Sequence, residues 1–329
     1  MKIKTFAILL LGIQFSVFAC KKAETSEVPN HRKGSTFYVD AKNGDDSNNG
    51  KTPAKAWKSL QKVNGYQFMA GDSLLFKAGD IWKGQLTPKG SGDAKNPIVV
   101  SIYSGTKKAL LDGEGKVSEV LKLEDVDYWE INHLEITNNA TTIGNRLGIL
   151  VKDNGASRKH IHLKNLYIHD VMGDYSFEMK GKNTGGIGII GTAESKFDDI
   201  LIEDCEIANV VRLGIFTNLT DGKKAVKGNR PITNLVIRRN KIHHCAGDGV
   251  IVRYSYRALV EHNEVWETHN ADEELVRYGV ALWCRSTDET IFQHNEVYNT
   301  RGGKDGQAFD ADEDAYRTVI QYNYSHDNE

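Results

Sequence analysis

Two stretches of this chain read Val260-Glu261-His262-Asn263-Glu264-Val265 and Phe292-Gln293-His294-Asn295-Glu296-Val297. Each is a short β-prone strand followed by a polar step, one asparagine and the start of another strand. Five further stretches keep this plan; two of them keep the asparagine, and three have leucine or cysteine at that position. The residues at that position are, in chain order, Leu134, Leu166, Cys205, Asn240, Asn263, Asn295 and Asn323. An internal repeat of about thirty residues with variable insertions predicts a solenoid of stacked coils.

The asparagines are the informative members of the repeat. If coils stack in register about 4.8 Å apart, identical amides can hydrogen-bond along a column inside the turn. Leucine and cysteine at the same position in earlier coils predict that the N-terminal end of the column is apolar. An antiparallel sandwich with accidental Asn turns is the alternative, but seven units keep one phase, which favours an all-β, parallel β-helix.

A second strand follows each turn after a glycine. Its first and third residues after the glycine are mostly apolar, so we expect them to point inward, because side chains alternate along a strand. The second and fourth residues then point outward. The six glycines that start these strands are Gly148, Gly186, Gly214, Gly249, Gly279 and Gly306.

The first part of the solenoid is expected to be a cap. Residues 52–63 have Pro53 where a helix would begin and apolar residues at helical spacing. A helix there would cover the open end of the sheets. We therefore divide the chain into a cap and first coil at residues 35–100 and β-helix repeats at residues 101–329. The sequence ends at Glu329, after one strand of its last coil and before the glycine strand that the coil requires. The C-terminal coils are therefore expected to be incomplete.

The N-terminus resembles an export signal. Lys2 and Lys4 precede an apolar run that ends at Ala19-Cys20, too short to span a bilayer comfortably. Residues 1–20 are interpreted as a lipoprotein signal peptide with Cys20 as the lipidated residue, and residues 21–34 as a flexible tether. The expected location is the cell envelope, lipid-anchored in the periplasm or on the outer surface; a plain secretory signal is the alternative.

The composition is that of a soluble globular protein. The chain has 329 residues and a formal net charge of −2, which gives no electrostatic reason to expect nucleic acid as a partner. A monomer is expected. Cys205, Cys245 and Cys284 lack the spacing of a disulfide framework and are interpreted as small buried side chains.

The entry segment and the repeats together resemble a known group. The entry segment contains the sequences Phe37-Tyr38-Val39-Asp40, Gly44-Asp45-Asp46-Ser47-Asn48-Asn49-Gly50 and Ala56-Trp57-Lys58-Ser59-Leu60. Over residues 37–329 the chain resembles secreted right-handed parallel β-helix proteins of the pectate-lyase-like superfamily. The resemblance implies polysaccharide lyases, glycoside hydrolases or adhesins. It carries over no catalytic residue, because the polygalacturonase signatures Asn-Thr-Asp, Gly-His-Gly and Arg-Ile-Lys are absent.

A candidate site follows from the outward rows of the glycine strands. Counting four and six residues from each glycine places Arg253, Trp283, Arg285, Asp310 and Asp312 on one outer face. An aromatic ring can cover a sugar face, guanidinium groups bind carboxylates, and two acids can perform glycoside hydrolysis. Asp310 and Asp312 are therefore the predicted catalytic pair, and Arg253, Trp283 and Arg285 the predicted substrate-binding residues.

Other interpretations of the same residues remain open. The acids could form a solvated turn, or a Ca²⁺ site with Asp305. The two arginines would also suit β-elimination on a uronate, with His243, His244, His269 or Tyr278 as acid or base. The leading hypothesis is a polysaccharide-degrading glycoside hydrolase. The alternatives are a polysaccharide lyase and a non-catalytic, glycan-binding or adhesive solenoid.

Overall fold

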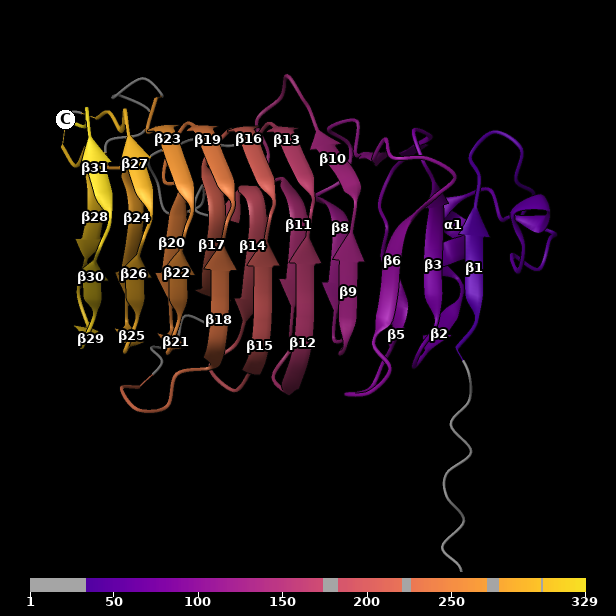
Figure 1. The fold of residues 1–329 in the computed structure, drawn as a ribbon, viewed down its shortest axis with the longest axis horizontal. Coiled ribbons are helices and arrows are strands. Elements are labelled where there is room, and N and C mark those ends of the chain that lie inside the picture. The colour runs from indigo at the N-terminus through magenta and orange to yellow at the C-terminus, as the bar shows by residue number, and fades with distance from the viewer. Residues whose placement is uncertain (1–33, 174–182, 221–225, 271–277, 303) are drawn as a thin grey trace, which may run out of the picture. The chain divides into compact units, whose positions relative to one another are not determined.

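The computed structural model describes residues 34–173, 183–220, 226–270, 278–302 and 304–329. In these residues, three parallel sheets of thirteen, nine and seven strands run along the stack of coils. Each strand pairs with its counterpart in the next coil, so strands far apart in sequence lie side by side (Figure 1). The predicted all-β, parallel β-helix is confirmed.

The strands are short and follow one another around each coil. The thirteen-stranded sheet contains β1 (Thr36–Val39), β3 (Ser73–Lys77), β6 (Ile98–Tyr103), β9 (Trp129–Asn132), β12 (Ser157–Lys164), β15 (Lys196–Glu203), β18 (Ile232–Arg238), β21 (Ser255–Tyr256), β22 (Leu259–Glu261), β25 (Thr287–Asp288), β26 (Ile291–Gln293), β29 (Ala315–Tyr316) and β30 (Val319–Gln321). The nine-stranded sheet contains β4 (Ile81–Lys83), β7 (Ala109–Asp112), β10 (Leu134–Asn138), β13 (Tyr167–Val171), β16 (Glu206–Val210), β19 (Lys241–Cys245), β23 (Glu264–Thr268), β27 (Glu296–Tyr298) and β31 (Tyr324–His326). The seven-stranded sheet contains β8 (Glu119–Glu124), β11 (Leu147–Lys152), β14 (Gly185–Gly191), β17 (Leu213–Leu219), β20 (Val250–Arg253), β24 (Val280–Arg285) and β28 (Gln307–Ala311). A further pair is formed by β2 (Gln67–Met69) and β5 (Lys89–Ser91).

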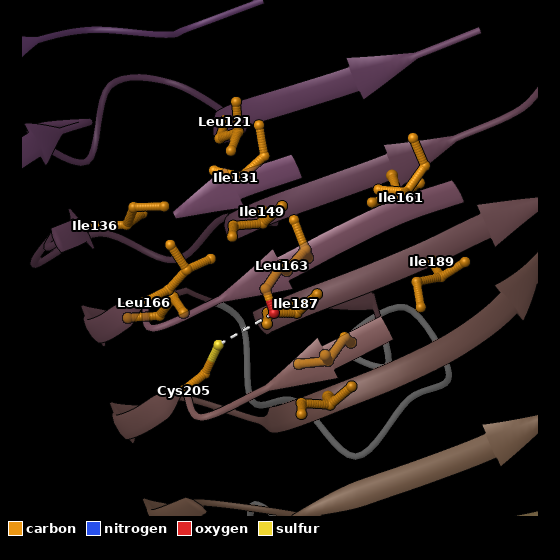
Figure 2. Close-up of a cluster of buried hydrophobic side chains, with 14 of the residues drawn as sticks. Leu121, Ile131, Ile136, Ile149, Ile161, Leu163, Leu166, Ile187, Ile189 and Cys205 are labelled. Atoms are coloured by element: carbon orange, nitrogen blue, oxygen red, sulfur yellow. Dashed lines mark hydrogen bonds between the residues drawn. The ribbon is translucent and has the colours of Figure 1, made fainter. Parts of the chain in front are cut away.

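The inward side chains of the three sheets form one continuous core. Ile131, Ile161 and Ile187 come from different sheets or coils, and all three are fully buried. Figure 2 shows them among neighbours that point into the same interior. The Cys205 side chain lies in this core, where burial raises the pKa of its thiol to about 12. Cys205, Cys245 and Cys284 are buried and free, which confirms their interpretation as small core residues.

The predicted asparagine column is present. Asn240 Nδ2 donates to Asn263 Oδ1 at 2.9 Å, Asn263 Nδ2 to Asn295 Oδ1 at 3.0 Å, and Asn295 Nδ2 to Asn323 Oδ1 at 3.0 Å. The amide oxygens also accept a backbone N–H from the preceding coil, and Cys205 N donates to Asn240 Oδ1 at 3.0 Å. The column therefore satisfies buried polar groups of each turn by using the next turn.

The polar step before the column has an unusual backbone. The residue just before each column position is non-glycine and has a positive φ, between 53° and 57°. These residues are His133, Asn165, Asp204, Arg239, His262, His294 and Tyr322. Such a conformation is uncommon for residues with a Cβ, and here it bends the chain sharply between two sheets at the same point of these seven coils.

The predicted capping helix is shorter than expected. Instead of one helix over residues 52–63, a 3₁₀ turn (Pro53–Lys55) is followed by α1 (Leu60–Asn64). The break occurs because Trp57 continues the first sheet: its N–H donates to Tyr38 O at 2.8 Å, and Val39 and Trp57 form a parallel bridge. Ser59 Oγ then accepts the N–H of Lys62 and starts the helix anew. Leu60 of this helix joins the core cluster, as a cap should.

Residues 33–329 form one compact unit. The described residues include no helix with the length and apolarity needed to cross a membrane. The signal peptide, Cys20 and the tether up to residue 33 lie outside the described residues, so export and lipidation stay predictions.

Candidate functional site

The site lies on the outer face of the seven-stranded sheet, and its register differs from the sequence prediction in one respect. Val250 pairs with Leu282, so Gly249 lies beside Ala281 and not beside Gly279. A Cβ on Gly249 would lie 2.6 Å from Ala281 O, which shows how little room this inner column leaves. The column therefore selects small residues, and Ala281 occupies the position that was assigned to Gly279.

Because of this shift of two residues, the outward-pointing residues of neighbouring strands pair differently from the prediction. Arg253 pairs with Arg285, whereas Trp283 pairs with Asp310. Counting from Gly279 had placed Arg253 in the same row as Trp283, and that assignment is wrong. The sequence also predicted that Val280 and Gln307 point into the main core, and the same shift makes this wrong. Val280 belongs to an outer apolar cluster, and Gln307 is exposed.

The five predicted site residues nevertheless come together. Arg253, Trp283, Arg285, Asp310 and Asp312 all line one cleft of about 820 Å³. They come from β20, β24 and the β28 region, three neighbouring coils. A volume of this size accommodates a small oligosaccharide segment. The prediction that stacking converts distant residues into lateral neighbours is therefore confirmed by the geometry.

Six acidic residues line the cleft, and the charges of two of them, Asp305 and Asp312, act on a third, Asp310. Asp310 and Asp312 lie two residues apart on β28 and its end, and Asp305 lines the same cleft. The pKa of Asp310 is raised above its ordinary value, first by burial and then by the negative charges of Asp312 and Asp305. A carboxyl group that stays protonated at higher pH is suited to donate a proton.

Arginine side chains distribute positive charge around these acids. Arg285 Nη2 donates to Glu313, and its Nη1 lies 3.7 Å from Asp312 Oδ2. Arg253 is 8% exposed, and its guanidinium carbon lies 5.1 Å from the centroid of the Trp283 ring. Burial lowers the pKa of Arg253. Its position over an aromatic face is a cation–π contact that holds the guanidinium at the cleft wall.

Trp283 forms part of the wall and is not an open platform. Only 6% of it is exposed, and it packs in the outer apolar cluster with Ile251 and Phe216. Its Nε1 donates to Asp248 Oδ1 at 2.9 Å, and the same oxygen accepts the N–H of Val280 at 2.9 Å. Asp248 therefore fixes the ring. The residues around Asp248 in the sequence carry no signal for this role, because its partner lies one coil away.

The exposed aromatic surface of the cleft comes from tyrosines that the row count did not select. Tyr278 and Tyr316 are 41% and 37% exposed, and Tyr254 also lines the cleft. Lys227 Nζ lies 3.5 Å from the centroid of the Tyr316 ring. A partly exposed tyrosine ring with a polar hydroxyl edge suits contact with sugar rings.

The histidines considered for lyase chemistry are not at this cleft. His243 and His244 lie on β19 in the nine-stranded sheet, and His269 lines a separate, smaller hollow with Arg301 and Glu329. Of the four residues considered as the acid or base of that chemistry, Tyr278 is the one that lines the cleft. The residues present thus favour a site of carboxylates, arginines and tyrosines.

The acids of the cleft are not among the converging ligand groups of the described residues. In the part of the chain that the structure describes, one group of three His, Cys, Asp or Glu side chains brings its ligand atoms within 4.8 Å of one another. That group is Glu130, His160 and His162, on β9 and β12, and it does not include Asp305, Asp310 or Asp312.

The chain is similar to one protein family, to a curated relative and to two solved structures. The model of a family described as right handed beta helix region matches residues 121–329. A lacto-N-biosidase of Bifidobacterium longum subsp. longum is 28% identical over 416 aligned positions, covering 98% of this chain and 26% of that protein. The native structure of the GH136 lacto-N-biosidase from Eubacterium ramulus has a TM-score of 0.79 at 24% identity, over 89% of this chain and 56% of that one. Its selenomethionine derivative gives 0.80 at 25% identity, over 91% and 57%. The chain thus spans about a quarter of the curated relative and a little over half of the solved chains.

Proposed function

Because this chain belongs to the right-handed beta-helix family, whose members share a fold and not one reaction, we propose its function from the cleft: it is a glycoside hydrolase of the lacto-N-biosidase type. The observation that carries this proposal is the cleft in which Asp310, with its raised pKa, lies beside Asp312 and Asp305. The similarity to lacto-N-biosidases over 98% of this chain supports the same reaction class.

The proposed roles follow from the surroundings of each acid. Asp310 is the general acid and donates its proton to the glycosidic oxygen as the bond breaks. Asp312, beside the positive charge of Arg285, is the nucleophile or the base that activates water. Alternate residues of a strand lie about 6–7 Å apart at Cα, so carboxyl groups on one face can reach the separations that glycoside hydrolysis uses.

The direct test is a product analysis. The purified chain is incubated with oligosaccharides that end in a lacto-N-biose unit and with a panel of polysaccharides, and products are separated by chromatography with mass detection. We expect release of a saturated disaccharide. Products with an unsaturated uronate, detected by ultraviolet absorbance, would instead show β-elimination. Saturable binding with no new reducing end on any glycan would identify a non-catalytic solenoid.

Activity should depend on pH through Asp310. A general acid must be protonated, so kcat is expected to fall as pH rises through the raised pKa of Asp310. Stability should change in the same direction: between the ordinary value of 3.8 and the raised pKa, the folded state binds more protons than the unfolded state, so stability is lost as pH rises. Urea denaturation of wild type and Asp310→Asn over this range checks the sign. The variant should lack this loss and be the more stable protein at neutral pH.

Tyr278 separates sugar contact from acid–base chemistry. Replacing it with Ala removes an exposed ring from the cleft, and we expect KM to rise about tenfold, which corresponds to about 1.4 kcal/mol of aromatic contact. Tyr278→Phe keeps the ring and should retain most of this affinity and kcat. A large loss of kcat in Tyr278→Phe would show that the hydroxyl takes part in proton transfer, as the lyase hypothesis requires.

A further inference from the structure

A second cluster of polar side chains lies on the outer face of the thirteen-stranded sheet. Glu130 is on β9, and His160 and His162 are on β12; one ligand atom of each lies within 4.8 Å of the others. The side chains of Glu130, His160 and His162 are 22%, 22% and 13% exposed. The cluster is therefore partly sheltered and still open to ions from solvent.

The backbone explains why the two histidines meet. Residues two apart in a strand are ordinarily about 6–7 Å apart, yet the ring centroids of His160 and His162 are 3.8 Å apart. His160 has a φ of +56°, a left-handed bulge that turns its ring toward His162. Glu130 joins them because it pairs with His162 in the register of β9 and β12.

Asp199 on β15 orients both imidazoles. Its Oδ2 lies 2.7 Å from His160 Nδ1, and its Oδ1 lies 3.0 Å from His162 Nε2. Each ring thus has one nitrogen fixed by a carboxylate oxygen and a second nitrogen that Asp199 does not use. His160 Nε2 faces Glu130 Oε1 at 3.2 Å. A carboxylate behind a ligating histidine is the arrangement that fixes its tautomer at metal sites.

Lys164 completes the setting of Glu130. Its Nζ donates to Glu130 Oε2 at 2.9 Å, so Oε1 is the oxygen directed toward His160. The two carboxylates and this one ammonium group have a net formal charge of −1 when the imidazoles are neutral, which favours a cation.

We propose that Glu130, His160 and His162 bind a divalent first-row transition metal ion such as Zn²⁺, with Asp199 as the residue that orients both histidines. Two imidazoles and one carboxylate suit these ions, whereas Ca²⁺ prefers oxygen ligands alone. The ion would replace the contact between His160 and Glu130 and link β9 to β12. The site is built on other strands than the cleft of β20, β24 and β28, so it does not depend on the proposed reaction.

The test is titration of the purified chain, without a polyhistidine tag and after treatment with a chelating resin, with ZnSO₄ in an isothermal titration calorimeter. We expect one saturable ion per chain and a rise in Tm with Zn²⁺, because a ligand that binds the folded state stabilises it. His162→Ala and Glu130→Gln should abolish the rise in Tm. Asp199→Asn should weaken binding by about 10- to 100-fold.

His169→Ala is the matched control. His169 also lies between two carboxylates, with Nδ1 at 2.7 Å from Asp170 and Nε2 at 3.2 Å from Glu135. Among the described residues, however, His169 does not belong to a converging group of three ligands. Its removal should leave Zn²⁺ affinity unchanged. Circular dichroism checks the fold of each variant. If a histidine variant fails to fold, the Zn²⁺ affinity of Asp199→Asn decides the test. Absence of saturable Zn²⁺ binding to the wild type, or equal affinity in Asp199→Asn, would overturn the proposal.

Discussion

The Asp310→Asn variant is expected to lose about a thousandfold in kcat, within the range that a general acid contributes. Asparagine keeps the shape of the side chain, but its amide is far too weak an acid to protonate the leaving oxygen. Asp312→Asn should lose at least as much, because an amide is neither a nucleophile nor a base. Release of disaccharide under saturating substrate measures kcat, and KM should change less than kcat in both variants, since the loss falls on the chemical step.

The controls for this pair separate chemistry from charge. Asp327 is an exposed acid beside His326 in the nine-stranded sheet, and Asp327→Asn should keep wild-type turnover. Asp305→Asn removes a further carboxylate whose charge raises the pKa of Asp310. This variant should lower the pKa of Asp310 and shift the pH profile accordingly. Unchanged turnover in both Asp310→Asn and Asp312→Asn would refute the proposed pair. If Asp305→Asn and only one of these two variants lose all turnover, the catalytic pair consists of Asp305 and that one residue.

The fold could be predicted because its main determinants are repeated. Asn240, Asn263 and Asn295 recur in one phase, and stacking turns that phase into a hydrogen-bonded column. The cap was harder, because a helical spacing over residues 52–63 competes with the pairing of Trp57 to the first strand. Local periodicity cannot reveal a partner strand that comes from elsewhere in the chain.

The site could be predicted only in part for a related reason. Glycine marks the inner column up to Gly249, but steric exclusion accepts alanine, and Ala281 continues the column. A count based on glycine identity therefore misplaced the rows by two residues, although the cleft still contains all five predicted residues. Asp248 and Tyr316 act through contacts with other coils, and their own sequence surroundings carry no sign of that.

The Asn263→Ala variant is expected to lose about 3–5 kcal/mol of unfolding free energy. Asn263 is 2% exposed, and its Oδ1 accepts both the backbone N–H and the Nδ2 of Asn240. Its Nδ2 donates to Ile237 O at 3.0 Å. Truncation leaves these buried groups without partners, at about 1–3 kcal/mol each. Urea denaturation followed by circular dichroism measures the change. Asn323→Ala at the end of the column, where the residue is half-buried, should cost less.

Asn263→Leu distinguishes hydrogen bonding from packing as the source of this stability. Leu134 and Leu166 fill the same position in earlier coils and are buried there, so the fold accommodates the leucine shape. A single leucine between Asn240 and Asn295 nevertheless leaves the same donors and the same carbonyl without hydrogen-bond partners as alanine does. We therefore expect Asn263→Leu to be nearly as unstable as Asn263→Ala. Wild-type stability in Asn263→Leu would contradict this, because it would mean that the column contributes volume alone and that its amide bonds add nothing net over water.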